Sequence, residues 1–154
     1  MPHIIMKKII IVSTTVFLIL SSCQKEKSTT NAPTCNKTVA DIAGTYSIVK
    51  VEAGLAEPLS DITNTEIKPC QLDDKLVLNA NGTSNYQDAG IACSPNGSAA
   101  GNWSIGSDGK ISANLGIADV ANATIVSFDC KTLVLLGDRV ISGLSVKFRV
   151  TLIK

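Results

Sequence analysis

Short runs of β-branched and aromatic residues, separated by turn-forming residues, fill the chain from about residue 70 onward. Asn81-Gly82 lies between two such runs, and Asn-Gly in that position is the strongest short-range signal for a hairpin. The final run, residues 144–152, alternates between apolar and polar side chains, as a strand does with one buried and one wet face. Short connections favour antiparallel neighbours. The pattern therefore constrains this part of the chain to an antiparallel, all-β fold.

The predicted strands follow one another with no convincing amphipathic helix between them. They cover residues 47–51, 74–79, 83–88, 99–105, 110–115, 121–128, 132–136 and 144–152. Residues 52–69 lack a sustained pattern and are expected to form a long connection with at most one helical turn, and Gly137-Asp138 is expected to loop out. About eight strands joined by short turns tend to close, because closure removes exposed edges. We therefore expect an up-and-down antiparallel β-barrel over residues 40–154.

Residues 1–22 have the pattern of a secretory signal peptide, expected as a signal helix: Lys7 and Lys8 precede an apolar run that is too short to span a bilayer. The end of that run, Leu-Ser-Ser-Cys, resembles a bacterial lipobox. The resemblance implies that Cys23 is linked to diacylglycerol, becomes the new N-terminus and is acylated, with palmitate as the expected acyl group. Several acyl chains give a stable membrane anchor. The alternative is an ordinary signal peptide with a chance cysteine.

The residues that follow Cys23 are polar up to Pro33, so we expect a flexible tether over residues 23–39 and a folded domain over residues 40–154. Gln24-Lys25-Glu26-Lys27 resembles the export signal of surface lipoproteins in Bacteroidota-type bacteria, with a plain solvated tether as the alternative. Gln24 in place of Asp favours, again by resemblance, the outer membrane over the inner one. The expected location is therefore the outer membrane, on its periplasmic or its cell-surface side.

Several classes of function are excluded by what the mature chain lacks. The only histidine, His3, lies in the predicted signal peptide, so Ser-His-Asp triads and histidine-ligated zinc are ruled out. The formal net charge of +1 provides no basic field for nucleic acid. Asp73 and Asp74 are neighbours, so on a strand they point to opposite faces; they are expected as the polar start of a strand. We expect no catalytic residue, no metal, no cofactor and no enzymatic activity.

Four cysteines remain after Cys23, and an even number in an exported chain predicts disulfides. Four cysteines allow three pairings. We favour Cys70–Cys93, which would clip a hairpin, together with Cys35–Cys130, which would tie the N-terminal segment to the barrel wall. The alternative is free buried thiols.

Gly44-Thr45-Tyr46 stands where lipocalins carry Gly-x-Trp on their first strand. Further along, Cys70-Gln71-Leu72-Asp73-Asp74, Asn81-Gly82-Thr83 and Gly101-Asn102-Trp103 follow in order. Together these motifs resemble the small lipocalin-like domain lipoproteins of Bacteroidota, with Tyr46 in place of the usual tryptophan. The resemblance covers residues 40–154 and implies a lipocalin-like barrel. Such eight-stranded barrels are either filled by side chains or hold one small ligand.

Two functions from different classes are therefore expected. The first is non-enzymatic binding of a small hydrophobic ligand or lipid in the barrel mouth, near Tyr46, Trp103 and Phe148, with core packing as the alternative role of these aromatic residues. The second is a protein-interaction or inhibitor lipoprotein with a solid barrel core, acting through the loops 52–69 or 89–98. The expected partners are the membrane through Cys23, a small hydrophobic ligand or an unknown protein, and no nucleic acid.

Overall fold

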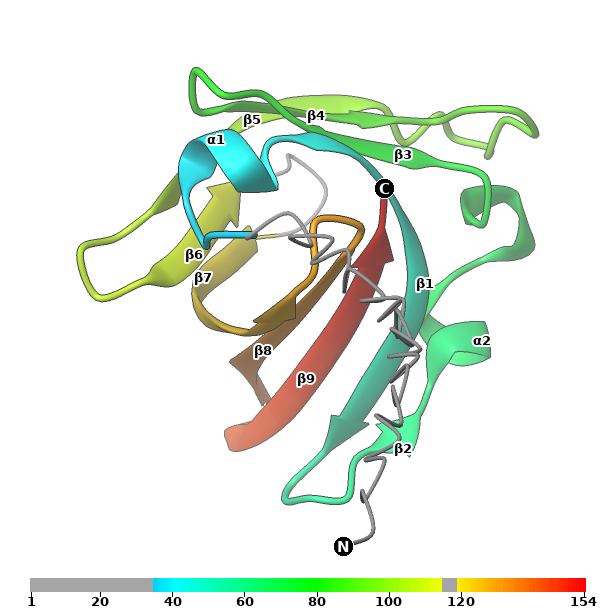
Figure 1. Ribbon diagram of the computed structural model, residues 1–154. Coiled ribbons are helices and arrows are strands. Elements are labelled where there is room, and N and C mark those ends of the chain that lie inside the picture. The colour runs from blue at the N-terminus through cyan, green and yellow to red at the C-terminus, as the bar shows by residue number, and fades with distance from the viewer. Residues whose placement is uncertain (1–34, 115–118) are drawn as a thin grey trace, which may run out of the picture. The chain divides into compact units, whose positions relative to one another are not determined.

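The computed structural model describes residues 35–114 and 119–154 (Figure 1). The predicted signal helix, Cys23 and most of the predicted tether lie outside the described residues. Residues Ala32–Lys154 form one compact unit, which includes the predicted domain over residues 40–154. This unit holds every described strand, the core and two disulfides, so it has what a domain needs to fold on its own. Among the described residues, no helix has the length and apolar character to cross a membrane.

The described elements are dominated by strands. In chain order they are α1 (Val39–Ile42), β1 (Gly44–Gly54), β2 (Ser60–Asp61), α2 (Thr63–Glu66), a 3₁₀ turn (Pro69–Gln71), β3 (Lys75–Leu78), β4 (Thr83–Gln87), β5 (Ala99–Ile105), β6 (Lys110–Asn114), β7 (Asp119–Phe128), β8 (Thr132–Ile141) and β9 (Leu144–Ile153). Strand β1 and strands β3 to β9 pair in sequence order, all antiparallel, and pairing between β1 and β9 closes the sheet. The predicted fold class, an all-β eight-stranded up-and-down barrel of the kind lipocalins have, is confirmed.

Strand β1 joins the two edges of the sheet. Gly44–Tyr46 pairs with β3, and Ser47–Gly54 pairs with β9, with an irregularity in register after Ile48. The edge that β1 leaves open near Glu52 is taken by the short strand β2. The first strand therefore extends past the predicted end at residue 51. The sequence did not show this because residues 52–54 have no apolar alternation of their own and are ordered by pairing with β9.

The hairpin between β8 and β9 corrects another prediction. Gly137-Asp138 does not loop out, because β8 continues through both residues to Ile141 and pairs along its whole length with β9. The turn is Ser142-Gly143, whose φ angles of 52° and 83° suit the two-residue turn that joins twisted strands. A Ser-Gly pair is itself a turn signal. The sequence thus contains two competing turn signals, Gly137-Asp138 and Ser142-Gly143, and the pairing of β8 with β9 selects the second.

Glycine is required at Gly101 for a reason of space. A Cβ atom on this residue would lie 1.6 Å from the backbone oxygen of Asn114, so no side chain fits without moving the backbone of β6. The following residue but one, Trp103, is buried, and its indole N–H donates to the backbone oxygen of Asn79 over 2.8 Å. The Gly-Asn-Trp motif therefore fixes the spacing of β5 and β6 and the packing of the core.

Both predicted disulfides are present. Cys35 is bonded to Cys130 and Cys70 to Cys93, each with a Cα–Cα distance of 5.4 Å. The first bridge joins the segment before α1 to the turn between β7 and β8, and the Lys37 ammonium group on the same segment donates to the backbone oxygen of Ile125 over 2.6 Å. The segment that precedes α1 is thus fastened to the barrel wall.

Candidate functional site

One end of the barrel is packed solid. Helix α1 lies across this end (Figure 1) and places Ile42, which is fully buried, in the core. The hydroxyl of the equally buried Tyr46 donates to the backbone oxygen of Ile42, and burial raises the pKa of Tyr46 above its ordinary range. The Lys154 ammonium group lies 5.4 Å from the centre of the Tyr46 ring and 5.3 Å from that of Phe128, and it donates to the backbone oxygen of Asp41. Tyr46 is therefore part of a plug.

The interior beyond this plug is hollow. A cavity of about 300 Å³ lies between β1, β3, β6, β7, β8 and β9. Its lining residues are Ile48, Leu76, Leu78, Ile111, Ala113, Val120, Ala121, Ala123, Leu135, Gly137, Asp138, Arg139, Phe148, Val150 and Leu152. Most are aliphatic, as is usual for sites that take small molecules. At roughly 30 Å³ per water-sized group, the space accepts a ligand portion of about ten non-hydrogen atoms.

The cavity exists because small residues face it. Ala113, Ala123 and Gly137 line it, and none carries a side chain beyond a single methyl group. Gly137 lies directly opposite Phe148 in the β8–β9 ladder. A Cβ atom on Gly137 would lie 3.6 Å from the Cβ of Ala123, an ordinary contact distance, so the site has room that the chain leaves unfilled. The large side chains that β9 contributes to the lining are therefore balanced by small residues on β6, β7 and β8.

The three aromatic residues predicted to contact a ligand do not gather in one place. Phe148 lines the cavity, together with its strand neighbours Val150 and Leu152. Tyr46 and Trp103 belong to the buried core, and neither is among the residues that line this cavity. Small residues on β6, β7 and β8 were missed as part of the site. For Gly137 the sequence held one signal, its alternation in phase with Leu133 and Leu135 on the same strand.

Charge enters only at the mouth of the cavity. Asp138 and Arg139 are the two charged residues among those that line it, and both are exposed. The Asp138 carboxylate lies 3.5 Å from the ammonium group of Lys147, its direct partner in the β8–β9 ladder. Beyond Arg139 the hairpin ends in exposed aliphatic residues, Ile141 and Leu144. The mouth therefore combines an apolar rim with one guanidinium group and one carboxylate, which is paired with Lys147.

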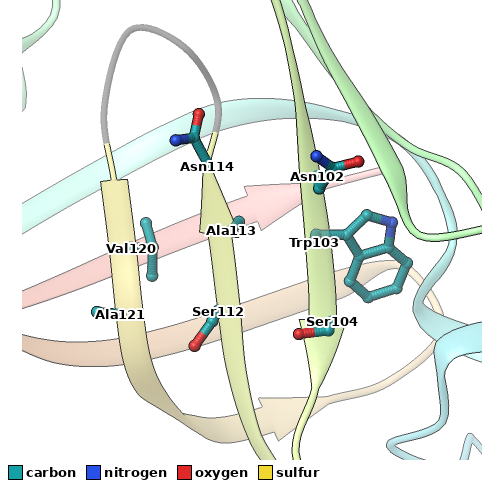
Figure 2. Close-up of a pocket in the computed structure, with 8 residues that line it drawn as sticks. All are labelled: Asn102, Trp103, Ser104, Ser112, Ala113, Asn114, Val120 and Ala121. Atoms are coloured by element: carbon teal, nitrogen blue, oxygen red, sulfur yellow. The ribbon is translucent and has the colours of Figure 1, made fainter.

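A second depression, of about 430 Å³, lies over β5, β6 and β7 (Figure 2). Its polar side chains face one another across neighbouring strands, as the pairs Asn102 with Asn114 and Ser104 with Ser112. The Trp103 indole lies on the side of β5 that is away from β6 (Figure 2). This depression is open, carries no charged side chain among its described lining residues and adjoins residues 115–118, which are not described. The apolar cavity, which is less open than this depression, is therefore the stronger candidate for a ligand site.

Asp74 has a different place from the one expected. It is buried, not a solvated start to β3, and its carboxylate accepts hydrogen bonds from the Tyr86 hydroxyl over 2.6 Å and from the backbone N–H of Ala89 over 2.9 Å. Burial raises the pKa of Tyr86 above its ordinary range, and the hydrogen bond to Asp74 raises it further. A sequence shows a polar residue before a strand but does not show which later segment folds over it.

Two more carboxylates fasten the loop that follows β4. Asp88 accepts hydrogen bonds from the backbone N–H groups of Cys93 and Gly97, and Asp73 accepts one from that of Ile91. Asp74, Asp88 and Cys93 lie close enough together to surround a cation. However, the Cys93 sulfur is bonded to Cys70, and both carboxylates already accept hydrogen bonds. The cluster therefore holds a loop in place and does not present free metal ligands.

Comparison with known proteins finds a similarity in structure but none in sequence. No protein-family model and no curated protein sequence matches the chain. Among solved structures, a bovine odorant binding protein in complex with a selenium-containing odorant is similar over 77% of this chain and 73% of its own, with 16% sequence identity and a TM-score of 0.44. The odorant is a ligand of the bovine protein.

Proposed function

We propose that this chain is an exported lipoprotein, held at the outer membrane by lipid on Cys23, whose barrel binds a small hydrophobic ligand without catalysing a reaction. The observation that carries the binding function is the partly enclosed cavity of about 300 Å³ with its largely aliphatic lining. An apolar ligand that enters such a space loses contact with water, and the gain in free energy is about 25 cal/mol for each Å² of apolar surface removed.

Binding is favoured over catalysis by the residues that face the space. Of the residues that line the cavity, only Asp138 and Arg139 carry groups able to exchange a proton or a charge. Asp138 pairs with Lys147, so it is not arranged with a nucleophile or a second carboxylate. Hydrolysis by paired groups needs partners within hydrogen-bond reach. The lining is suited to holding an apolar group and leaving it unchanged.

The cavity can be tested by filling it. Titration calorimetry of the Ala32–Lys154 unit with 1-octanol should show saturable binding. Gly137→Leu, which projects a side chain into the space beside Ala123 and Phe148, should weaken binding at least tenfold. Gly137→Ala is the matched control, because its added methyl group meets Ala123 at an ordinary contact distance. Unaltered binding by Gly137→Leu, with an unchanged thermal unfolding temperature, would refute binding in the cavity.

A protein-interaction role has one observation in its favour. The loop from Asp88 to Ser98 is fixed by carboxylates and a disulfide, and it presents Ile91 with 70% of its surface exposed. A rigid loop loses little conformational freedom when a partner binds. The solid barrel core expected for this role is absent in the described residues, where the cavity lies instead. Ligand binding is therefore the first proposal and loop-mediated binding the second.

A further inference from the structure

Arg139 occupies the inward face of β8. Side chains alternate between the two faces of a strand, so Leu133, Leu135, Gly137 and Arg139 share one face. Leu133 is fully buried in the core, and Leu135 and Gly137 line the cavity. Arg139 therefore continues the line of residues that face the barrel interior, at the point where that line reaches solvent, and it is itself part of the cavity lining.

The neighbouring charged residues, including Asp138, which also borders the cavity, alternate along their strands with the inward-facing residues. Asp138 and Lys147 are direct partners in the β8–β9 ladder and form an ion pair. Arg149, two residues further along β9, pairs with Glu52 and Glu57. Within the part of the chain that the structure describes, no carboxylate lies within ion-pair distance of the Arg139 guanidinium group. Arg139 is thus a cation in the cavity lining that has no ion pair with any described carboxylate.

The structure assigns to Arg139 the recognition of an anionic head group, so that the ligand is an amphiphile with a short alkyl chain in the cavity and a carboxylate or phosphate at the mouth. This rests on the proposed function. A guanidinium group donates two parallel hydrogen bonds to either anion. The exposed position of Arg139 leaves the head group in contact with water, while about ten non-hydrogen atoms of chain fill the space behind it.

Matched ligands separate the head group from the chain. Octanoate, monooctyl phosphate and 1-octanol carry the same alkyl chain length and differ in charge, and each is titrated calorimetrically into the Ala32–Lys154 unit and its Arg139→Gln variant. We expect Arg139→Gln to weaken the binding of octanoate or monooctyl phosphate about tenfold, which is at the low end of what charge-assisted hydrogen bonds contribute. The affinity for 1-octanol should change less than twofold. The anion that loses more affinity identifies the head group.

Lys147→Gln is the control, since it removes the same charge near the mouth but from the outer face of β9. It should change the affinity for octanoate less than twofold. Equal effects of Arg139→Gln on charged and neutral ligands, or equal effects of the two variants on octanoate, would overturn the assignment while cavity binding stands. Failure of all three ligands to bind the unaltered unit would overturn the proposed function and, with it, the role of Arg139.

Discussion

The two disulfides are expected to stabilise the domain by different amounts. Cys35–Cys130 closes a loop with a sequence separation of 95, and Cys70–Cys93 one with a separation of 23. A crosslink restricts the unfolded chain more when the loop is longer. The chain-entropy relation gives about 4.7 kcal/mol for a separation of 95 and about 3.4 kcal/mol for one of 23. Replacing the first pair with alanine should therefore cost about 1.3 kcal/mol more than replacing the second.

Local structure around the two bridges should not reverse the order of their contributions to stability. The loop closed by Cys70–Cys93 is also held by the carboxylates of Asp88 and Asp73, so its folded geometry survives without the bridge. Cys130 has a φ of 71°, in the left-handed region. Alanine is the right replacement there because it keeps a Cβ atom, so the backbone strain is the same with and without the bridge.

The measurement is urea unfolding of Cys35→Ala/Cys130→Ala and Cys70→Ala/Cys93→Ala under oxidising conditions. Trp103 is the only tryptophan in the sequence and is 3% exposed, so its fluorescence reports the loss of the core. Each variant lacks one bridge and keeps the other. An equal loss of unfolding free energy in the two variants, or a larger loss without Cys70–Cys93, would refute the loop-entropy reasoning.

Two further predictions concern ionisation and anchoring. Burial raises the pKa of Tyr46 and Tyr86 above the ordinary value of 10.0, so the folded chain keeps protons that the unfolded chain releases. The contribution of these two tyrosines to the unfolding free energy should therefore be constant below pH 10 and fall above it, by up to about 1.4 kcal/mol per pH unit for each tyrosine. Urea unfolding between pH 9 and 11 should show a shallower fall for Tyr86→Phe, and an unchanged slope would contradict this. Cells that express the full chain should incorporate labelled palmitate into it, and the Cys23→Ala substitution should abolish this incorporation. Label that remains on the Cys23→Ala chain would show that the lipid is attached to another residue.

Local sequence signals were sufficient for most strands. The strand over residues 99–105 has the predicted bounds, and Asn81-Gly82 forms the expected turn between β3 and β4. Turn chemistry and alternation act over a few residues, so the sequence displays them directly. The Cys70–Cys93 bridge is similarly local, because it spans one hairpin and the loop beside it.

The site depended on contacts between distant segments. Tyr46 packs beneath α1 and not in the cavity because Ile42 supplies the acceptor for its hydroxyl, a pairing that no strand pattern predicts. Gly137 has the character of a turn residue, yet its place opposite Phe148 makes it part of a cavity wall. Arg139 was not singled out because its meaning depends on the phase of β8, which became clear only when Ser142-Gly143 was fixed as the turn.

The bridge between Cys35 and Cys130 also fixes the end of the barrel at which the preceding chain joins the domain. Cys130 lies in the turn between β7 and β8, and the neighbouring Lys131 accepts a hydrogen bond from the backbone of Lys154, so this turn belongs to the plugged end. The chain that precedes Cys35 therefore joins the domain at the plugged end, whereas the cavity opens at the other end, beside the β8–β9 hairpin. If the proposed lipid on Cys23 anchors the chain, the tether joins the described domain through Cys35, at the end opposite the cavity mouth.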